Sequence, residues 1–195
     1  AVYQYTYDAK NRLKTATIAS GTVSLEYDAL NRIISENYNG RLVTYANNVA
    51  GRSQSTIYPD GTIVAKDYDT RNRLINIRKN GTVVASYLYN DADQIISQTL
   101  ANGVITNYQY DFANRLISIN TGNGSIQHTN FTYDKNQNKL AINRLNAPTK
   151  SEQFVYDNGN RLTNYTRGIS GGPSNVVNTY SYDALGNRIA ANLNG

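Results

Sequence analysis

Polar and apolar residues alternate along most of the chain, in short runs separated by turn signals. In Val83-Ala85-Tyr87-Tyr89 and Val104-Thr106-Tyr108-Tyr110, every second residue falls on the same face of an extended strand, which gathers a valine and two tyrosines there. No segment shows a convincing helical period, and the abundant Asn, Thr, Ser and Tyr are poor helix formers. The pattern predicts strands of about six to eight residues and no substantial helix.

The turn signals between these runs are of two kinds. Asn-Gly at 39–40, 80–81 and 102–103 is typical of a two-residue type I′ hairpin turn, and Pro-Asp-Gly at 59–61 serves the same purpose. Longer loops are expected at 121–124, 146–149 and 170–175. The predicted unit is therefore a β-hairpin, and the chain reads as an array of consecutive antiparallel hairpins.

One heptapeptide recurs at the end of nearly every hairpin. YDALNRI at 27–33 returns as YDAKNRL at 7–13, YDTRNRL at 68–74, YDFANRL at 110–116 and YDNGNRL at 156–162. Aligned on the tyrosine there are nine copies, and Asn47 replaces the tyrosine in the third. The arginine of the heptapeptide defines a basic column, in which Gln94 and Lys139 replace the arginine in the fifth and seventh copies. The structural repeat positions are Tyr7, Asp8, Arg12, Tyr27, Asp28, Arg32, Tyr68, Asp69, Arg73, Tyr89, Tyr110, Asp111, Arg115, Tyr133, Asp134, Tyr156, Asp157, Arg161, Tyr182, Asp183 and Arg188.

The recurring residues suit a structural joint between hairpins. An aspartate at a strand end can accept hydrogen bonds from the backbone of the following turn, and the Asn or Gly before the arginine can adopt the left-handed conformation. The arginine fork can bind both carboxylate oxygens of the aspartate, in the same or an adjacent copy. A second aromatic column lies two residues before the tyrosine, and we expect both columns to stack on their equivalents in neighbouring copies and to form the core.

Composition supports a turn-rich, ordered chain. The 195 residues include 28 Asn, 14 Gly and 17 Tyr but no Trp, Met or Cys, so thiolate metal sites and disulfides are excluded. The net charge of +5 is scattered rather than clustered, which argues against nucleic-acid binding. No apolar run is long enough for a membrane span, and no stretch of these residues has the pattern of a signal peptide. We expect one β array over residues 1–195, either a fragment of a longer repeat region or a self-assembling unit.

Catalysis is the weakest interpretation, and no cofactor or metal is expected. The single histidine, His128, is expected in an exposed loop of the seventh hairpin and lacks evident partners for a hydrolytic or zinc site. An aspartate ladder could bind Ca²⁺, but in most copies an arginine four residues later would neutralise the carboxylate. Paired carboxylates at every joint do not suit an active site, which is singular.

The repeat Y-x-Y-D-x-x-[NG]-R-[LI] resembles the YD-repeat family, also called the Rhs (rearrangement hot spot) family. Its members include the shells of bacterial insecticidal toxin complexes, Rhs effectors, wall-associated proteins and the teneurins. The resemblance covers essentially the whole chain. It implies a long antiparallel sheet that curves or spirals into a solenoid or shell, in secreted or surface-exposed proteins, several of which have been thought to bind carbohydrate. A counterpart of the family's C-terminal self-cleaving segment is not found.

These observations favour a non-enzymatic scaffold segment of a secreted or cell-surface protein, as part of a shell, stalk or filament wall. One alternative is an adhesin that binds glycans or a cell-surface protein through its outer sheet face and hairpin loops. Another is an extracellular filament subunit, because the terminal strand around 2–7 carries no charge and no proline and could add a strand from an identical chain. Further YD repeats of the same or an identical chain are the expected partners.

Overall fold

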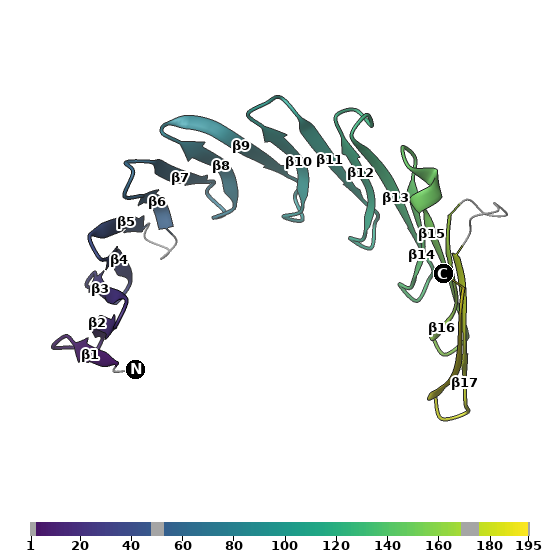
Figure 1. Ribbon diagram of the computed structural model, residues 1–195. Helices are drawn as coiled ribbons and strands as arrows, with labels where there is room; N and C mark the ends of the chain where they lie inside the picture. Colours follow the sequence, from purple (N-terminus) through teal and green to yellow (C-terminus); the bar gives the residue numbers. More distant parts are fainter. Residues whose placement is uncertain (1–2, 48–52, 169–175, 195) are drawn as a thin grey trace. The chain divides into compact units, whose positions relative to one another are not determined.

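The computed structural model describes residues 3–47, 53–168 and 176–194. Within these ranges the protein contains eighteen β-strands and one short 3₁₀ turn, Pro148–Lys150, and consecutive strands from β1 to β9 and from β10 to β18 pair antiparallel (Figure 1). The predicted all-β array of consecutive hairpins is confirmed. In this part of the chain, no helix is long and apolar enough to cross a membrane.

The chain forms two compact units, residues 1–87 and 88–195, and the boundary falls within strand β9. The first unit holds β1 (Gln4–Tyr7), β2 (Leu13–Ile18), β3 (Gly21–Tyr27), β4 (Ile33–Tyr38), β5 (Arg41–Asn47), β6 (Ser53–Ile57), β7 (Ile63–Tyr68), β8 (Leu74–Lys79) and most of β9 (Thr82–Tyr89). The second unit holds β10 (Ile95–Leu100), β11 (Ile105–Tyr110), β12 (Leu116–Thr121), β13 (Gln127–Tyr133), β14 (Lys139–Arg144), β15 (Glu152–Tyr156), β16 (Leu162–Arg167), β17 (Val176–Tyr182) and β18 (Arg188–Asn194).

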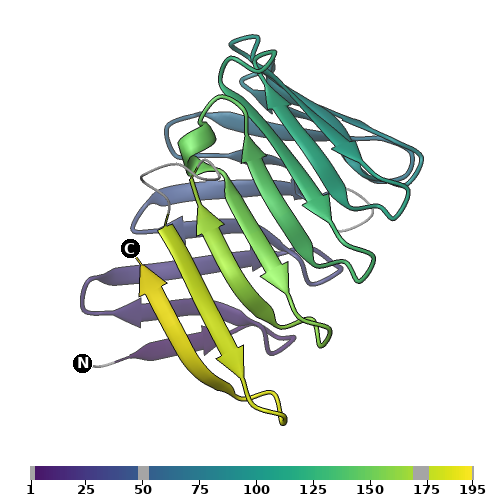
Figure 2. The same cartoon turned by 90° about the vertical axis from the view of Figure 1, so that its right-hand side faces the viewer.

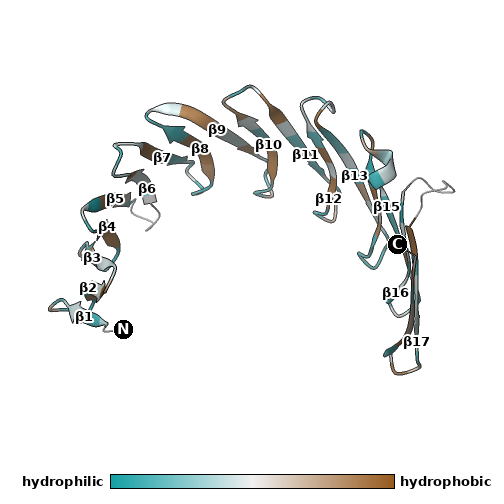
Figure 3. Ribbon diagram, viewed as in Figure 1, coloured by the Kyte–Doolittle hydropathy of each residue, from teal (hydrophilic) through white to brown (hydrophobic). Residues whose placement is uncertain are grey.

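Each unit is a single layer of strands with both faces open. In Figure 2 the green to yellow strands of the second unit lie side by side, and in Figure 3 hydrophobic and hydrophilic residues alternate along the strands. Among the described residues, Ala85 is the one buried apolar residue, and the motif tyrosines are half-buried or exposed. The expected aromatic core is therefore a half-buried layer, because a sheet without a second layer leaves its side chains in contact with water.

The turns lie alternately at the two edges of each sheet. At one edge are the turns that begin at the motif aspartate; we call Asp111–Arg115 and its equivalents the YD turns. At the other edge, Asn39-Gly40 and Asn80-Gly81 both have positive φ, as the predicted type I′ turns require. The third Asn-Gly prediction is wrong. Leu100 and Val104 enclose a three-residue loop in which Gly103, but not Asn102, has positive φ.

Asparagines at this second edge join one hairpin to the previous one. Asn39 Oδ1 accepts the N–H of Thr22 at 2.9 Å, and its Nδ2 donates to the carbonyl of Ser20 at 3.2 Å. A Cβ atom at Gly21 would lie 2.2 Å from this Nδ2, so glycine is needed there. Asn80 and Asn146 accept backbone N–H groups of the previous hairpin in the same way, from Ile63 and His128. The sequence reasoning missed this second set of joints.

Candidate functional site: the joint between hairpins

The YD turn has a fixed length and a fixed backbone geometry. In the sixth copy, the N–H of Asp111 donates to the carbonyl of Arg115 at 2.9 Å, and the N–H of Asn114 donates to the carbonyl of Asp111 at 3.0 Å. Asn114 has φ 61°, in the left-handed region. This is a three-residue hairpin loop, a type I turn followed by a left-handed residue. The pairing shifts register at Tyr110, a bulge that raises the local twist.

The aspartate side chain holds this loop closed. Asp111 Oδ1 accepts the N–H groups of Ala113 and Arg115, each at 2.9 Å, and Oδ2 accepts Nε of Arg115 at 2.7 Å. Because Oδ1 is occupied by the backbone, the arginine binds one carboxylate oxygen rather than both, which corrects the expected two-oxygen fork. The same Asp–Arg pairs form at Asp8–Arg12, Asp28–Arg32, Asp69–Arg73 and Asp157–Arg161.

Two residues assigned to the basic column are not the partners of their aspartates. In the seventh copy Asn138, not Lys139, donates its N–H and its Nδ2 to the Asp134 carboxylate. In the ninth copy Asn187, not Arg188, donates both to Asp183. The turn geometry selects the residue four positions after the aspartate, so the residue after it starts the next strand.

The substituted copies keep the hydrogen-bond pattern with other side chains. Asn90 and Gln94 replace the Asp–Arg pair in the fifth copy, with Nδ2 of Asn90 donating to Oε1 of Gln94 at 2.8 Å. Asn48 and Arg52 of the third copy lie outside the described residues, as does the loop expected at 170–175.

Arg12, Arg115 and Arg161 also reach the next YD turn along the edge. Nη1 donates to the carbonyl of the next motif aspartate, and the guanidinium lies over the next motif tyrosine. The donor distances are 3.1 Å for Arg12–Asp28, 2.9 Å for Arg115–Asp134 and 3.1 Å for Arg161–Asp183. The distances from the guanidinium carbon to the ring centre are 4.5 Å for Arg12–Tyr27, 4.8 Å for Arg115–Tyr133 and 4.9 Å for Arg161–Tyr182. Both contacts are typical of stabilising cation–π and charge-assisted interactions.

The motif tyrosine bonds in the opposite direction, back to the previous copy. Its hydroxyl donates to the carbonyl of the residue after the arginine position, at 2.8 Å for Tyr27–Leu13, 2.9 Å for Tyr110–Ile95, 2.9 Å for Tyr133–Leu116 and 2.8 Å for Tyr182–Leu162. Asn47, which replaces the tyrosine in the third copy, donates its Nδ2 to the equivalent carbonyl of Ile33 at 3.2 Å. Arginine and tyrosine together therefore connect successive hairpins in both directions.

Ring-on-ring stacking between neighbouring copies is not what the structure shows. Equivalent residues of successive copies lie two strands apart, about 9.6 Å, which exceeds the contact range of aromatic rings. One aromatic pair, Phe154 and Tyr165 at 5.5 Å, lies across neighbouring strands β15 and β16. The guanidinium of the intervening strand takes the place expected for a second ring.

These contacts shift the acidity of the joint. Hydrogen bonds from the Arg12 side chain and backbone hold the pKa of Asp8 below its ordinary value. The backbone N–H of Arg115 and, after it, the Arg115 side chain do the same for the pKa of Asp111. The Asn138 side chain lowers the pKa of Asp134. The carboxylates are thus ionised, hydrogen-bonded parts of the turn.

His128 does not lie in an exposed loop as expected. It is half-buried in β13, paired with Asn120 of β12, and its backbone N–H donates to Asn146. Over the ranges that the structure describes, no three His, Cys, Asp or Glu side chains lie close enough together to hold a metal ion.

Comparison with known proteins connects this geometry to a family. The RHS Repeat family model matches residues 7–41 and 89–126. No curated protein matches the chain.

Solved structures share the fold. The crystal structure of TcdB2-TccC3-Cdc42 aligns with 98% of this chain at 17% identity and a TM-score of 0.74. The Tc holotoxin pore of Photorhabdus luminescens, with a mutated TccC3, aligns with 98% at 18% identity and a TM-score of 0.74. The chain spans 13% and 12% of the length of those two chains. At such identity the likeness shows the fold alone. The recurring joints and the family match agree with it, and the chain carries YD/Rhs repeats.

Proposed function

We propose that this chain is a non-enzymatic wall segment of a secreted or cell-surface bacterial protein, a stretch of sheet that builds a shell or stalk. The observation that carries the proposal is the distribution of its chemistry. The recurring carboxylates, guanidinium groups and phenols bind one another at successive joints, whereas an active site would gather such groups at one place. The aligned toxin-complex chains, several times longer, favour a role as one stretch of a larger wall.

A turn-by-turn scan tests the scaffold role. Replacing each motif aspartate by alanine, one turn at a time, should lower the urea midpoint of unfolding at every interior turn by comparable amounts. Asp28, Asp111 and Asp157 are the informative positions, since all three have an arginine partner. One turn whose replacement left stability intact but abolished an activity of the protein would contradict the proposal.

Cell fractionation tests the location. An antibody against the chain should detect it in the culture medium or on intact producing cells, where added protease should degrade it. Detection in the cytosol alone would contradict the extracellular part of the proposal and leave the scaffold role standing.

A second candidate function, glycan binding, is favoured by β1. Tyr3, Tyr5 and Tyr7 alternate with polar residues, so they share one face, and they are 61%, 55% and 57% exposed. Exposed aromatic rings in a row can stack on sugar rings. A glycan array probed with the chain and with a Tyr3→Ala, Tyr5→Ala, Tyr7→Ala variant tests this candidate. Binding that the variant loses supports it, and an array without binding excludes it for the sugars tested.

A further inference from the structure

The joint between the seventh and eighth YD turns lacks an arginine. Asn138 occupies the position that Arg12 has in the first turn, and it reproduces part of what the arginine does there. Its Nδ2 donates to Asp134 Oδ2 at 2.9 Å and to Asn160 Oδ1 at 2.8 Å. The equivalent contacts of Arg12 are to Asp8 and Asn31. The Asn138 side chain is shorter than an arginine and makes only these two of the arginine contacts.

The other groups that an arginine contacts, the next motif tyrosine and the carbonyl of the next motif aspartate, have no guanidinium partner at this joint. In the described part of the chain, no cation lies over the ring of Tyr156, and its hydroxyl makes no hydrogen bond, unlike the hydroxyls of Tyr133 and Tyr182. The carbonyl of Asp157 accepts the N–H of Asn160 within its own turn, but no guanidinium. The corresponding carbonyls of Asp134 and Asp183 each accept an arginine Nη1 in addition.

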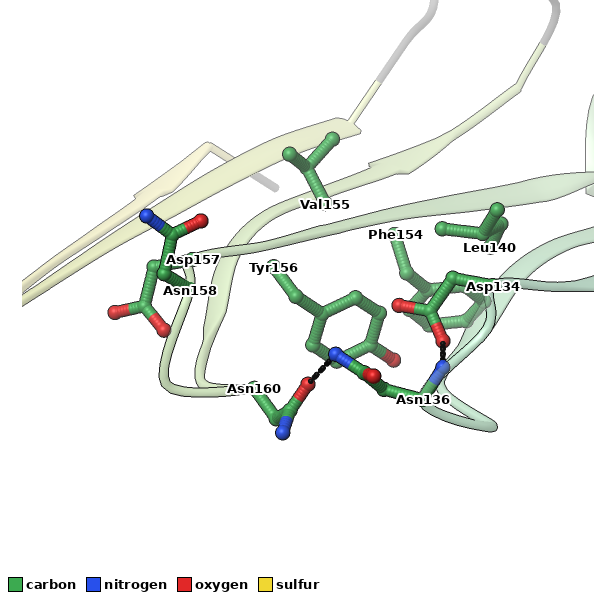
Figure 4. Close-up of a pocket in the computed structure, with 9 residues that line it drawn as sticks. All are labelled: Asp134, Asn136, Leu140, Phe154, Val155, Tyr156, Asp157, Asn158 and Asn160. Atoms are coloured by element: carbon green, nitrogen blue, oxygen red, sulfur yellow. Dashed lines mark hydrogen bonds between the residues drawn. The ribbon is translucent and has the colours of Figure 1, made fainter.

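An open pocket of about 350 Å³ lies at this joint (Figure 4). Its walls include Asp134, Asn136, Phe154, Tyr156, Asp157 and Asn160, with neither Lys nor Arg among the lining residues. The Tyr156 ring lies between the two turns in Figure 4, beside the hydrogen bond from Asn136 to Asn160.

The strands beside the pocket are less tightly paired than elsewhere. β14 and β15 are in register at two positions, Ala141–Gln153 and Ile142–Glu152, whereas β12–β13 and β16–β17 are each in register at four. The groove one joint earlier is lined by Arg115 and Tyr133, so that joint carries its own guanidinium. Burial and, after it, the negative charge of Asp134 raise the pKa of Tyr156.

We propose that this pocket binds a guanidinium cation, presented by an arginine side chain of a partner polypeptide. Three other joints define the ligand, because the side chains of Arg12, Arg115 and Arg161 fill the same place there. A guanidinium is planar, stacks on aromatic rings and carries five donors. It would lie over Tyr156 and donate to the carbonyl of Asp157 and to the free acceptor capacity of Asp134 Oδ2. The inference goes beyond the scaffold role and depends only on the geometry of this joint.

Three small probes test the chemistry of the pocket. N-acetyl-arginine amide is titrated into the isotope-labelled full chain and followed by NMR, beside the lysine and citrulline analogues. The arginine probe should shift the resonances of Tyr156 and residues 157–160 saturably, with a dissociation constant on the order of 1 mM. The lysine probe should bind more weakly, because an ammonium cannot stack or fork, and citrulline, which has the same shape but no charge, should not bind. Equal responses to arginine and citrulline, or no response to arginine, would overturn the proposal.

A pair of matched variants locates the binding. Asn138→Arg supplies the missing guanidinium from the chain itself, so it should abolish binding of the arginine probe and raise the unfolding temperature. Asn187→Arg adds the same charge at the equivalent position of the ninth turn and should leave binding unchanged. Tyr156→Leu removes the ring and should weaken binding, which covers the case in which Asn138→Arg fails to fold. Undiminished binding to a folded Asn138→Arg or to Tyr156→Leu would show that the site lies elsewhere.

Discussion

At the scale of single residues, the YD turn depends on a left-handed backbone conformation and on a charged side-chain pair. Asn11, Asn31, Asn72, Asn114 and Asn160 have φ between 60° and 64°, and Gly186 takes the same place in the ninth copy with φ 90°. An ordinary side chain is disfavoured in this region because its Cβ approaches the carbonyl, whereas Asn and Gly tolerate it. The backbone conformation explains why Asn and Gly predominate at this position, which Asp93 and Gln137 occupy in the fifth and seventh copies with φ 61° and 71°.

Substitution at Asn11 tests this explanation. Asn11→Ala should lower the free energy of unfolding by about 1 kcal/mol, because the left-handed backbone conformation is unfavourable for alanine. Asn11→Gly should change it little. Urea unfolding followed by circular dichroism measures both. Equal losses for the two variants would mean that the asparagine side chain, not its backbone conformation, is what the turn needs.

The Asp–Arg pair is the second feature that stabilises the turn, and the fifth copy contains an uncharged pair in its place. Asp111→Asn and Arg115→Gln alone should each lower the unfolding midpoint, since each leaves a charge without its partner. The double variant recreates the Asn–Gln pair of Asn90 and Gln94 and should recover much of the loss. A double-mutant cycle measures the coupling. Independent, additive effects of the two changes would show that the columns do not act as a pair.

At the scale of elements, the tyrosine hydroxyl is the contact that returns from one hairpin to the previous one. Tyr27→Phe removes the hydrogen bond to the Leu13 carbonyl and keeps the ring under Arg12, so it should lower the free energy of unfolding by about 1 kcal/mol. Tyr7→Phe changes the same column in the first turn, where the described residues show no such bond, and should have little effect. Similar losses in the two variants would point to the ring environment instead.

The joints should also make the hairpins sensitive to acid. The pKa of Asp28, Asp69, Asp111 and Asp157 is lowered in the folded chain from the ordinary value of 3.8, first by the N–H of the paired arginine. A lowered pKa gives stability that is fully present above the ordinary value and is lost as pH falls through the folded one. The urea midpoint should therefore hold from neutral pH to about pH 5 and then fall steadily below about pH 4. Asp111→Asn should flatten part of that fall, and an unchanged midpoint down to pH 2 would contradict the expectation.

Much of this element-scale structure could be predicted from the sequence, and the failures have physical causes. Alternation and turn residues locate the hairpins, because the period of a strand is set by its geometry. The type I′ turn predicted from Asn-Gly at 102–103 was wrong, because the same dipeptide also fits the last two positions of a three-residue loop. The prediction was wrong at Lys139 and Arg188 because it relied on the basic residue type, whereas the length of the turn decides which residue pairs with the aspartate. The residue four positions after Asp134 is Asn138. The pocket beside Tyr156 depends on how far a side chain reaches across two strands, which a linear pattern does not contain.

At the scale of the whole molecule, the outer strands decide how the chain meets other chains. β1 pairs with β2 in the first unit, and β18 pairs with β17 in the second, each on one side within the described residues. The strand Gln4–Tyr7 carries no charged residue and no proline, the devices that usually protect an edge. An unprotected edge offers backbone donors and acceptors to another strand, whether from further repeats or from a second copy.

Self-association tests whether these edges are used. The chain should form larger particles as its concentration rises in sedimentation, and the backbone amides of β1 should exchange more slowly in those particles than in dilute solution. Gln4→Lys with Thr6→Lys places charge on the edge strand and should return the chain to monomer, because a charged edge repels a second strand. Lys substitutions at Thr163 and Ser181, in interior strands, are the control and should leave association unchanged. A strictly monomeric chain at millimolar concentration, with equal amide exchange at all dilutions, would show that the edges do not recruit a second copy and would remove the filament alternative.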